Sequence, residues 1–216
     1  MIKINIQYSV QKEVERVLDT INRIDGSIKR GYDIEKLLFP QNLSYKDFKL
    51  MDKKQIEELI IKEYDINDYE KNIKYIQDRW IQIEPNLSKG IEKMKIPLIP
   101  KFNIIFTKYG IVGSYCSPNT IIVNFQKFYY EGVLRSIIHE SIHLIINPFI
   151  LKYKIDHWSK ERIVDLIFLD IFPKLSKMKV ILNTSELDKI FYKYFPNIEE
   201  VIFRISELNK KNCVKL

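Results

Sequence analysis

Residues 137–146 have the sequence IIHESIHLII, an apolar run that carries two histidines, one glutamate and one serine. They belong to a longer apolar segment, which predicts a helix from about Tyr130 to Ile146, stopped by Asn147-Pro148. In a helix, residues four apart lie one above the other on the same face. The imidazoles of His139 and His143 can therefore be aimed at one point beside the helix.

This arrangement is typical of a metal site. Two imidazole nitrogens aimed at one point suit an ion such as zinc, whose bonds to histidine nitrogen are about 2 Å long. Glu140 neighbours the first histidine and is placed to take a proton from a water that the metal activates. All the histidines of the chain, His139, His143 and His157, fall within one short stretch. The competing interpretation is a pair of hydrogen-bonded core histidines with a glutamate between them by chance.

A catalytic zinc site needs a third protein ligand and one position left open. Glu161 is the first candidate, because it stands near the start of the next apolar helix. Asp165 follows one turn later on the same face, and could accept the free ring N–H of a ligand histidine and so orient it. His157 and Asp165 remain alternative ligands. The competing interpretation is that Glu161 and Asp165 only form surface ion pairs with Lys160 and Arg162.

The rest of the chain predicts an α+β protein that is mostly helical. Alternating apolar and polar residues at 2–7 predict a short strand, and residues from about 11 to 96 have helical periodicity, with a turn signal at Glu84-Pro85-Asn86. Three short β-type runs follow, at 102–108, 111–116 and 120–126. Turn residues separate these runs, which predicts a small antiparallel meander immediately before the histidine helix.

The C-terminal part contains a second apolar helix, expected from about Ser159 to Phe172, and two amphipathic helices separated near Pro196. We therefore expect two regions. Residues 1–100 form an N-terminal strand and a helical region. Residues 101–216 contain the meander, the histidine helix, the glutamate helix and the C-terminal helices. We expect the two regions to pack as one compact unit.

The motif His139-Glu140-x-x-His143 followed by Glu161-x-x-x-Asp165 resembles the gluzincin clan of zinc metallopeptidases, which includes thermolysin-like and aminopeptidase-like enzymes. The spacing from His143 to Glu161 is close to that of the clan, which also has an antiparallel sheet before its active-site helix. The resemblance covers residues 102–173. It implies a zincin-like fold, a Zn²⁺ cofactor and a substrate-binding edge strand at 111–116, with Gly113 and Ser114 nearest the site.

The function that this resemblance implies is hydrolysis of peptide bonds by a zinc-dependent metallopeptidase with Glu140 as general base. The developing oxyanion needs a donor besides zinc, which in the family is a Tyr or a His. Tyr153 and His157 both lie between the second histidine and the glutamate ligand and are the first candidates. Tyr192 and Tyr194, further along the chain, are further options. The alternative is a zincin-fold regulatory or binding protein without general proteolytic activity, whose helical N-terminal region recognises a protein partner.

The composition narrows the classes of partner that the protein is expected to bind. The formal net charge is +7, but the basic residues are spread along the chain and form no clustered stripe, so nucleic-acid binding is not expected. The two cysteines are far apart and match no ligand spacing. No apolar run is typical of a signal peptide or long enough to span a bilayer. We therefore expect a cytoplasmic protein with a peptide or protein substrate, and the pattern does not indicate its oligomeric state.

Overall fold

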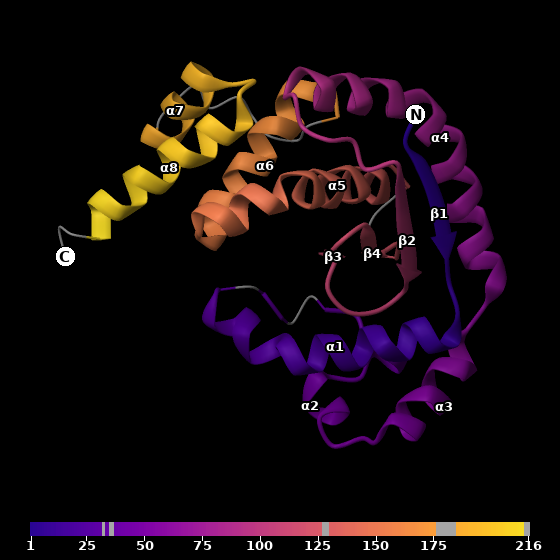
Figure 1. Ribbon diagram of the computed structural model, residues 1–216. Coiled ribbons are helices and arrows are strands. Elements are labelled where there is room, and N and C mark those ends of the chain that lie inside the picture. The colour runs from indigo at the N-terminus through magenta and orange to yellow at the C-terminus, as the bar shows by residue number, and fades with distance from the viewer. Residues whose placement is uncertain (32, 35–36, 127–129, 176–184, 214–216) are drawn as a thin grey trace. The chain divides into compact units, whose positions relative to one another are not determined.

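The computed structural model describes residues 1–31, 33–34, 37–126, 130–175 and 185–213 (Figure 1). This part of the chain is mostly helical and has one small sheet, so the prediction of a mostly helical α+β protein is confirmed. The strands are β1 (Lys3–Gln7), β2 (Lys101–Thr107), β3 (Gly113–Cys116) and β4 (Thr120–Asn124). The helices are α1 (Val10–Lys29), α2 (Tyr45–Phe48), α3 (Lys53–Glu63), α4 (Ile66–Lys93), α5 (Tyr130–Tyr153), α6 (His157–Ile171), α7 (Glu186–Tyr194) and α8 (Ile198–Cys213), with a 3-10 helix at Pro40–Asn42.

The chain forms two compact units, each built from segments that are separate in the sequence. The first unit contains the described residues of Met1–Lys3, Ile81–Pro100 and Ile138–Leu216, and the second contains those of Ile4–Trp80 and Lys101–Ile137. The chain passes between units at residues 100 and 101, where the sequence also changes character. Each unit is thus discontinuous rather than a single range of residues such as 1–100 or 101–216.

The sheet is mixed, and its strand order is β1-β2-β4-β3. β3 pairs antiparallel with β4, with Ser114 opposite Ile122. β2 pairs parallel with β4, with Ile104 opposite Ile121. The prediction of an antiparallel meander is therefore wrong in one respect, because β4 lies between β2 and β3 and runs parallel to β2. β3 is at the edge of the sheet, where a substrate-binding strand was expected.

The segment between β2 and β3 gives a physical reason for this order. The Lys108 N–H donates to the Glu13 carboxylate of α1 at 2.7 Å, and the Ile111 carbonyl accepts from the Arg16 guanidinium at 2.7 Å. These backbone groups bond to α1 and do not close a tight hairpin between β2 and β3. The chain therefore carries β3 to the edge, and the more buried strand β4 takes the position next to β2.

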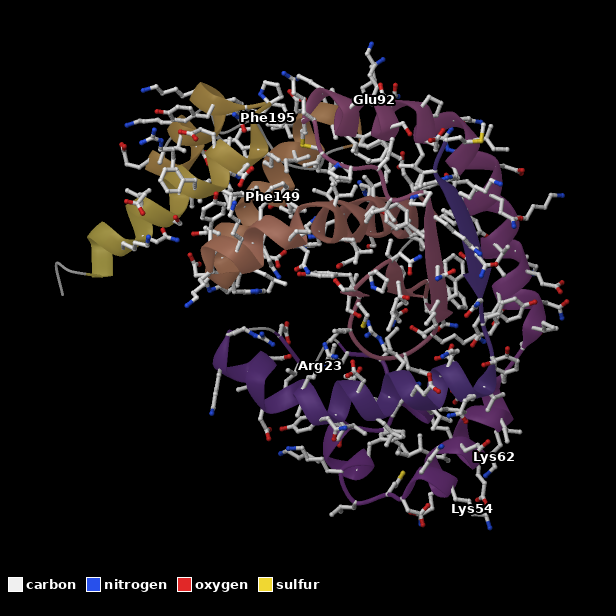
Figure 2. All side chains as sticks on the ribbon, viewed as in Figure 1. Arg23, Lys54, Lys62, Glu92, Phe149 and Phe195 are labelled. Carbon is white, nitrogen blue, oxygen red and sulfur yellow. The ribbon has the colours of Figure 1, made fainter. Side chains whose placement is uncertain are left out.

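In the second unit, α1 and α3 pack against each other (Figure 1). α3 is amphipathic. It buries Ile56 and Ile60 in a core that includes Val14 of α1, while Lys54 and Lys62 on its other face project into solvent (Figure 2). Apolar residues at a four-residue step form such a buried stripe. The periodicity that predicted helices in this part of the chain is thus explained by burial.

α4 and α5 are longer than the sequence suggests, because both continue through a proline. α4 includes Pro85, where a turn was expected, and α5 includes Pro148 and ends at Tyr153. A proline inside a helix removes one backbone hydrogen bond and costs about 3 kcal/mol. In α5 the residues on both sides of the proline, Ile146 and Ile150, are buried, so packing offsets this cost. No helix in the described part of the chain is long and apolar enough to cross a membrane.

The remaining helices of the first unit agree with the prediction. α6 falls within two residues of its expected bounds, and α7 and α8 lie side by side and are separated at Pro196 (Figure 1). Arg162 of α6 donates two hydrogen bonds, at 2.8 and 2.6 Å, to the two carboxylate oxygens of Asp188 in α7. Two parallel charge-assisted bonds of this kind are strong and directional. They attach α7 to the helix that carries the glutamate.

Candidate metal centre

The two predicted histidine ligands come from the part of α5 that belongs to the first unit. Ile138 and Ile142, which lie beside them in the sequence, are fully buried and anchor the helix in the core. His143 is 3% exposed and His139 is 28% exposed. One imidazole is therefore enclosed by protein, while the other is partly open to solvent.

Glu161 comes from the start of α6, and a helix cap determines its position. The Asp156 side chain accepts a hydrogen bond from the Ser159 N–H at 3.0 Å, which begins the helix. Ile163 and Val164 then pack into the core. Glu161, 26% exposed, is left with its carboxylate beside the two histidines.

The structure brings the three predicted ligands together. His139 Nε2 and His143 Nε2 are 3.1 Å apart, and they lie 3.3 and 3.2 Å from the same oxygen, Glu161 Oε2. Four ligands arranged tetrahedrally around zinc, with bonds of 2.0–2.1 Å, are about 3.3 Å from one another. The cluster of His139, His143 and Glu161 therefore has the donor atoms and the spacing to hold a metal ion.

Hydrogen bonding alone satisfies this triangle poorly. Each imidazole Nε2 has one bonding direction, along which it offers either a proton or a lone pair. In the cluster, each Nε2 lies at similar distances from two partners, so a single bond direction is shared between them. A cation near the centre of the three atoms would accept all three lone pairs at once.

The pKa values of the cluster differ from their ordinary values for clear reasons. Burial lowers the pKa of His143 to about 4, so this imidazole is neutral near pH 7, as a metal ligand must be. Burial also lowers the pKa of His139, but the bond to Glu161 and the charges of Glu140 and Asp165 outweigh it, and its pKa is raised. Burial favours the neutral form of Glu161, yet the two histidines hold its pKa well below its usual range.

Asp165 and His157 lie at the outer side of the cluster. Asp165 Oδ1 is 3.6 Å from His139 Nδ1, the ring atom that the predicted orienting contact requires, although this separation is longer than a hydrogen bond. Burial raises the pKa of the Asp165 carboxyl. His157 Nδ1 is 3.7 Å from Glu161 Oε1, the oxygen that does not face the other histidines. His157 is thus close to the cluster through Glu161 and not as one of its three converging atoms.

The surface ion pairs considered as an alternative are present only in part. Lys160 Nζ lies 3.3 Å from Glu161 Oε1, so Glu161 contacts both the lysine and the histidines. Arg162 is hydrogen-bonded to Asp188. Among the described residues it forms no close ion pair with Asp165 or Glu161, although its charge acts on Asp165. Sequence reasoning considered Lys160 only as a solvent-exposed partner of Glu161 and missed its place in the cluster, since neighbouring helix residues normally point in different directions.

Glu140 and Tyr153, the other predicted catalytic residues, differ in their placement. Glu140 is buried, with 9% exposure, and its charge acts on the neighbouring His139. The Tyr153 hydroxyl donates to Glu199 of α8 at 3.0 Å. Tyr153 is ten residues after His143 on α5, which corresponds to about 15 Å along a straight helix. The structure therefore keeps Glu140 beside the cluster and does not bring the Tyr153 hydroxyl to it.

Gly113 and Ser114, the predicted substrate contacts, lie on the edge strand β3 in the second unit. The Ser114 hydroxyl accepts a hydrogen bond from the Arg16 guanidinium at 2.8 Å. Arg16 also bonds to the Ile111 carbonyl, so one buried side chain holds both the second residue of this strand and the segment that leads into it. The role of Gly113 and Ser114 in substrate binding stays a prediction.

Comparison with known protein families, with curated proteins and with solved structures finds no match to this chain. The site is therefore defined by its own chemistry: two imidazole nitrogens and one carboxylate oxygen that converge in the first unit, with a buried glutamate beside them.

Proposed function

We propose that this protein is a zinc-dependent metallopeptidase with a zincin-like active site. The observation that carries the proposal is the convergence of His139 Nε2, His143 Nε2 and Glu161 Oε2 at 3.1–3.3 Å from one another. Two nitrogens and one oxygen form a donor set typical of catalytic zinc, which uses three protein ligands and leaves a fourth position open. Calcium and magnesium, by contrast, take mostly oxygen ligands.

When bound, zinc would supply Lewis-acid polarisation of the scissile carbonyl and would lower the pKa of a water molecule. Glu140 would accept the proton as this water attacks and then give it to the leaving amine. The partial exposure of His139 and Glu161 supports access of a substrate from that side, while His143 closes the inner side. Such a general base favours a catalytic role, because a purely structural metal site has no need of one.

The first test measures metal and peptide cleavage in the same preparations. Wild-type protein is expected to bind about one zinc per chain and to cleave members of a peptide library. Glu140→Gln should keep the zinc but lose cleavage by at least about a hundredfold, since general-base catalysis contributes 10²–10⁴-fold. His143→Ala, as a matched variant on the same helix, should lose both zinc and cleavage.

Folded wild-type protein without affinity for zinc would refute the metal site. Wild-type protein that binds zinc but is as inert as Glu140→Gln on every peptide would refute the peptidase proposal. That second result would favour the regulatory or binding role, in which the metal site serves another purpose.

A further inference from the structure

The two oxygens of Glu161 have different partners. Oε2 faces the Nε2 atoms of His139 and His143, at 3.3 and 3.2 Å. Oε1 faces Lys160 Nζ at 3.3 Å and His157 Nδ1 at 3.7 Å. One oxygen is thus directed to the candidate metal position, and the other is directed to the ammonium of Lys160, with a third imidazole, that of His157, further away.

Lys160 is placed differently from the exposed lysines of the same unit. Its side chain is 17% exposed, whereas that of Lys189, which pairs with Glu186 on α7, is 54% exposed. Side chains one residue apart on a helix do not normally face each other. The Lys160 ammonium is nevertheless held against Glu161 and away from bulk water, where an ammonium is otherwise strongly hydrated.

We infer that Lys160 is a positioning residue that engages the outer oxygen of Glu161 and makes this carboxylate a one-oxygen ligand. The inference rests on the proposed metal site. A carboxylate that bound through both oxygens would occupy a further coordination position, which the reaction needs for water or the substrate carbonyl. Lys160 also draws negative charge from the carboxylate, which leaves the metal a stronger Lewis acid. Partners of this kind orient metal ligands and tune the metal.

The experiment uses cobalt(II) as the probe, bound to the full chain in place of zinc. Four-coordinate cobalt absorbs visible light more strongly than cobalt with five or six ligands. Lys160→Met, which keeps a long side chain but removes the ammonium, should weaken the visible band as Glu161 becomes a two-oxygen ligand. Metal affinity in chelator competition should rise, because the carboxylate then keeps its full charge and donates through both oxygens.

Two further variants make the result specific. Lys160→Arg keeps a cation at this position and should retain most of the band intensity that Lys160→Met loses. If Lys160 had only a structural role, the band intensity would not depend on the charge at this position. Lys189→Met removes a lysine of the same unit that pairs with Glu186, and should leave both the band and the affinity unchanged. If circular dichroism shows that Lys160→Met does not fold, Lys160→Gln, which removes the same ammonium, replaces it in the same measurement.

The two proposals fail in distinguishable ways. Wild-type protein that binds neither zinc nor cobalt would refute the proposed function. Wild-type protein that binds cobalt, together with a folded Lys160→Met whose spectrum and affinity equal those of the wild type, would refute the role of Lys160 and leave the metal site intact.

Discussion

Glu13 of α1 is a buried acid in the second unit that the candidate metal centre does not use. One of its oxygens accepts hydrogen bonds from the Tyr69 hydroxyl at 2.5 Å and from the Lys108 N–H at 2.7 Å. The other, Oε2, is buried and has no hydrogen-bond partner among the described residues. Burial raises the pKa of Glu13 to about 7, although the bonds from Tyr69 and Lys108 act in the opposite direction.

This raised pKa predicts that stability decreases as pH rises. The folded state binds the proton of Glu13 more tightly than the unfolded state, in which the pKa is near 4.5. The free energy of unfolding therefore falls by on the order of 3 kcal/mol in total between pH 4.5 and about 7, and it then levels off. Glu13→Gln resembles the protonated acid and should lose this dependence. Urea unfolding from pH 4.5 to 8 measures both proteins, and equal pH dependence in the two would contradict the assignment.

At the scale of elements, Gly90 fixes a close contact between α4 and α6. A Cβ atom at this position would lie 2.4 Å from Cδ1 and 2.7 Å from Cγ1 of Ile171, the last residue of α6. Gly26 of α1 is also inside a helix, but a Cβ there meets only the end of Arg30, at 3.8 Å. The Gly90 position therefore has no room for a larger side chain, whereas the Gly26 position does.

We predict that the same substitution has opposite effects at these two positions. An alanine in a helix interior is normally more stable than a glycine by about 1 kcal/mol, so Gly26→Ala should stabilise the protein by up to this amount. Gly90→Ala should destabilise it by about 1–3 kcal/mol, because Ile171 must leave its position. Chemical denaturation of both variants measures the two changes. A stabilised Gly90→Ala would show that α6 can move away from α4 at little cost.

At the scale of the whole molecule, all three candidate ligands belong to one of the two compact units. A ligand that binds only the folded state stabilises it by about 2.7 kcal/mol at a concentration of 100 Kd. Local openings that separate α5 from α6 within the first unit break the site, whereas openings confined to the second unit leave the ligands in place.

Zinc should therefore protect the two units unequally in hydrogen exchange. We expect slower exchange in residues 138–153 of α5 and in α6 after zinc is added, and little change in α1 and α3. Mass spectrometry of peptides from the four helices, with and without zinc, makes the comparison. The metal-site variant His143→Ala is the control and should show no zinc effect in any helix. Equal protection of both units would mean that they open only together.

The local features of the candidate site were predictable from sequence. His139 and His143 share a face because the helical period is a local property, and apolar residues around them ensure that this face is packed. Glu161 and Asp165 were predicted for the same reason, since both stand one turn apart on the next helix. The continuation of α5 through its proline was harder to predict. The cost of Pro148 inside a helix is offset by burial of Ile146 and Ile150, which the sequence of α5 does not reveal.

By itself, then, the sequence predicted most of the helices and named His139, His143 and Glu161 as side chains that could meet a metal. Only the tertiary structure decided which atoms meet: Oε2 of Glu161 with the histidines, Oε1 with Lys160, and the Tyr153 hydroxyl with Glu199. It also decided that β4 lies beside β2, because Glu13 and Arg16 of α1 bind the backbone of the connecting segment. Apart from the pair of Lys160 and Glu161, these contacts join residues far apart in the chain, and no local periodicity encodes them.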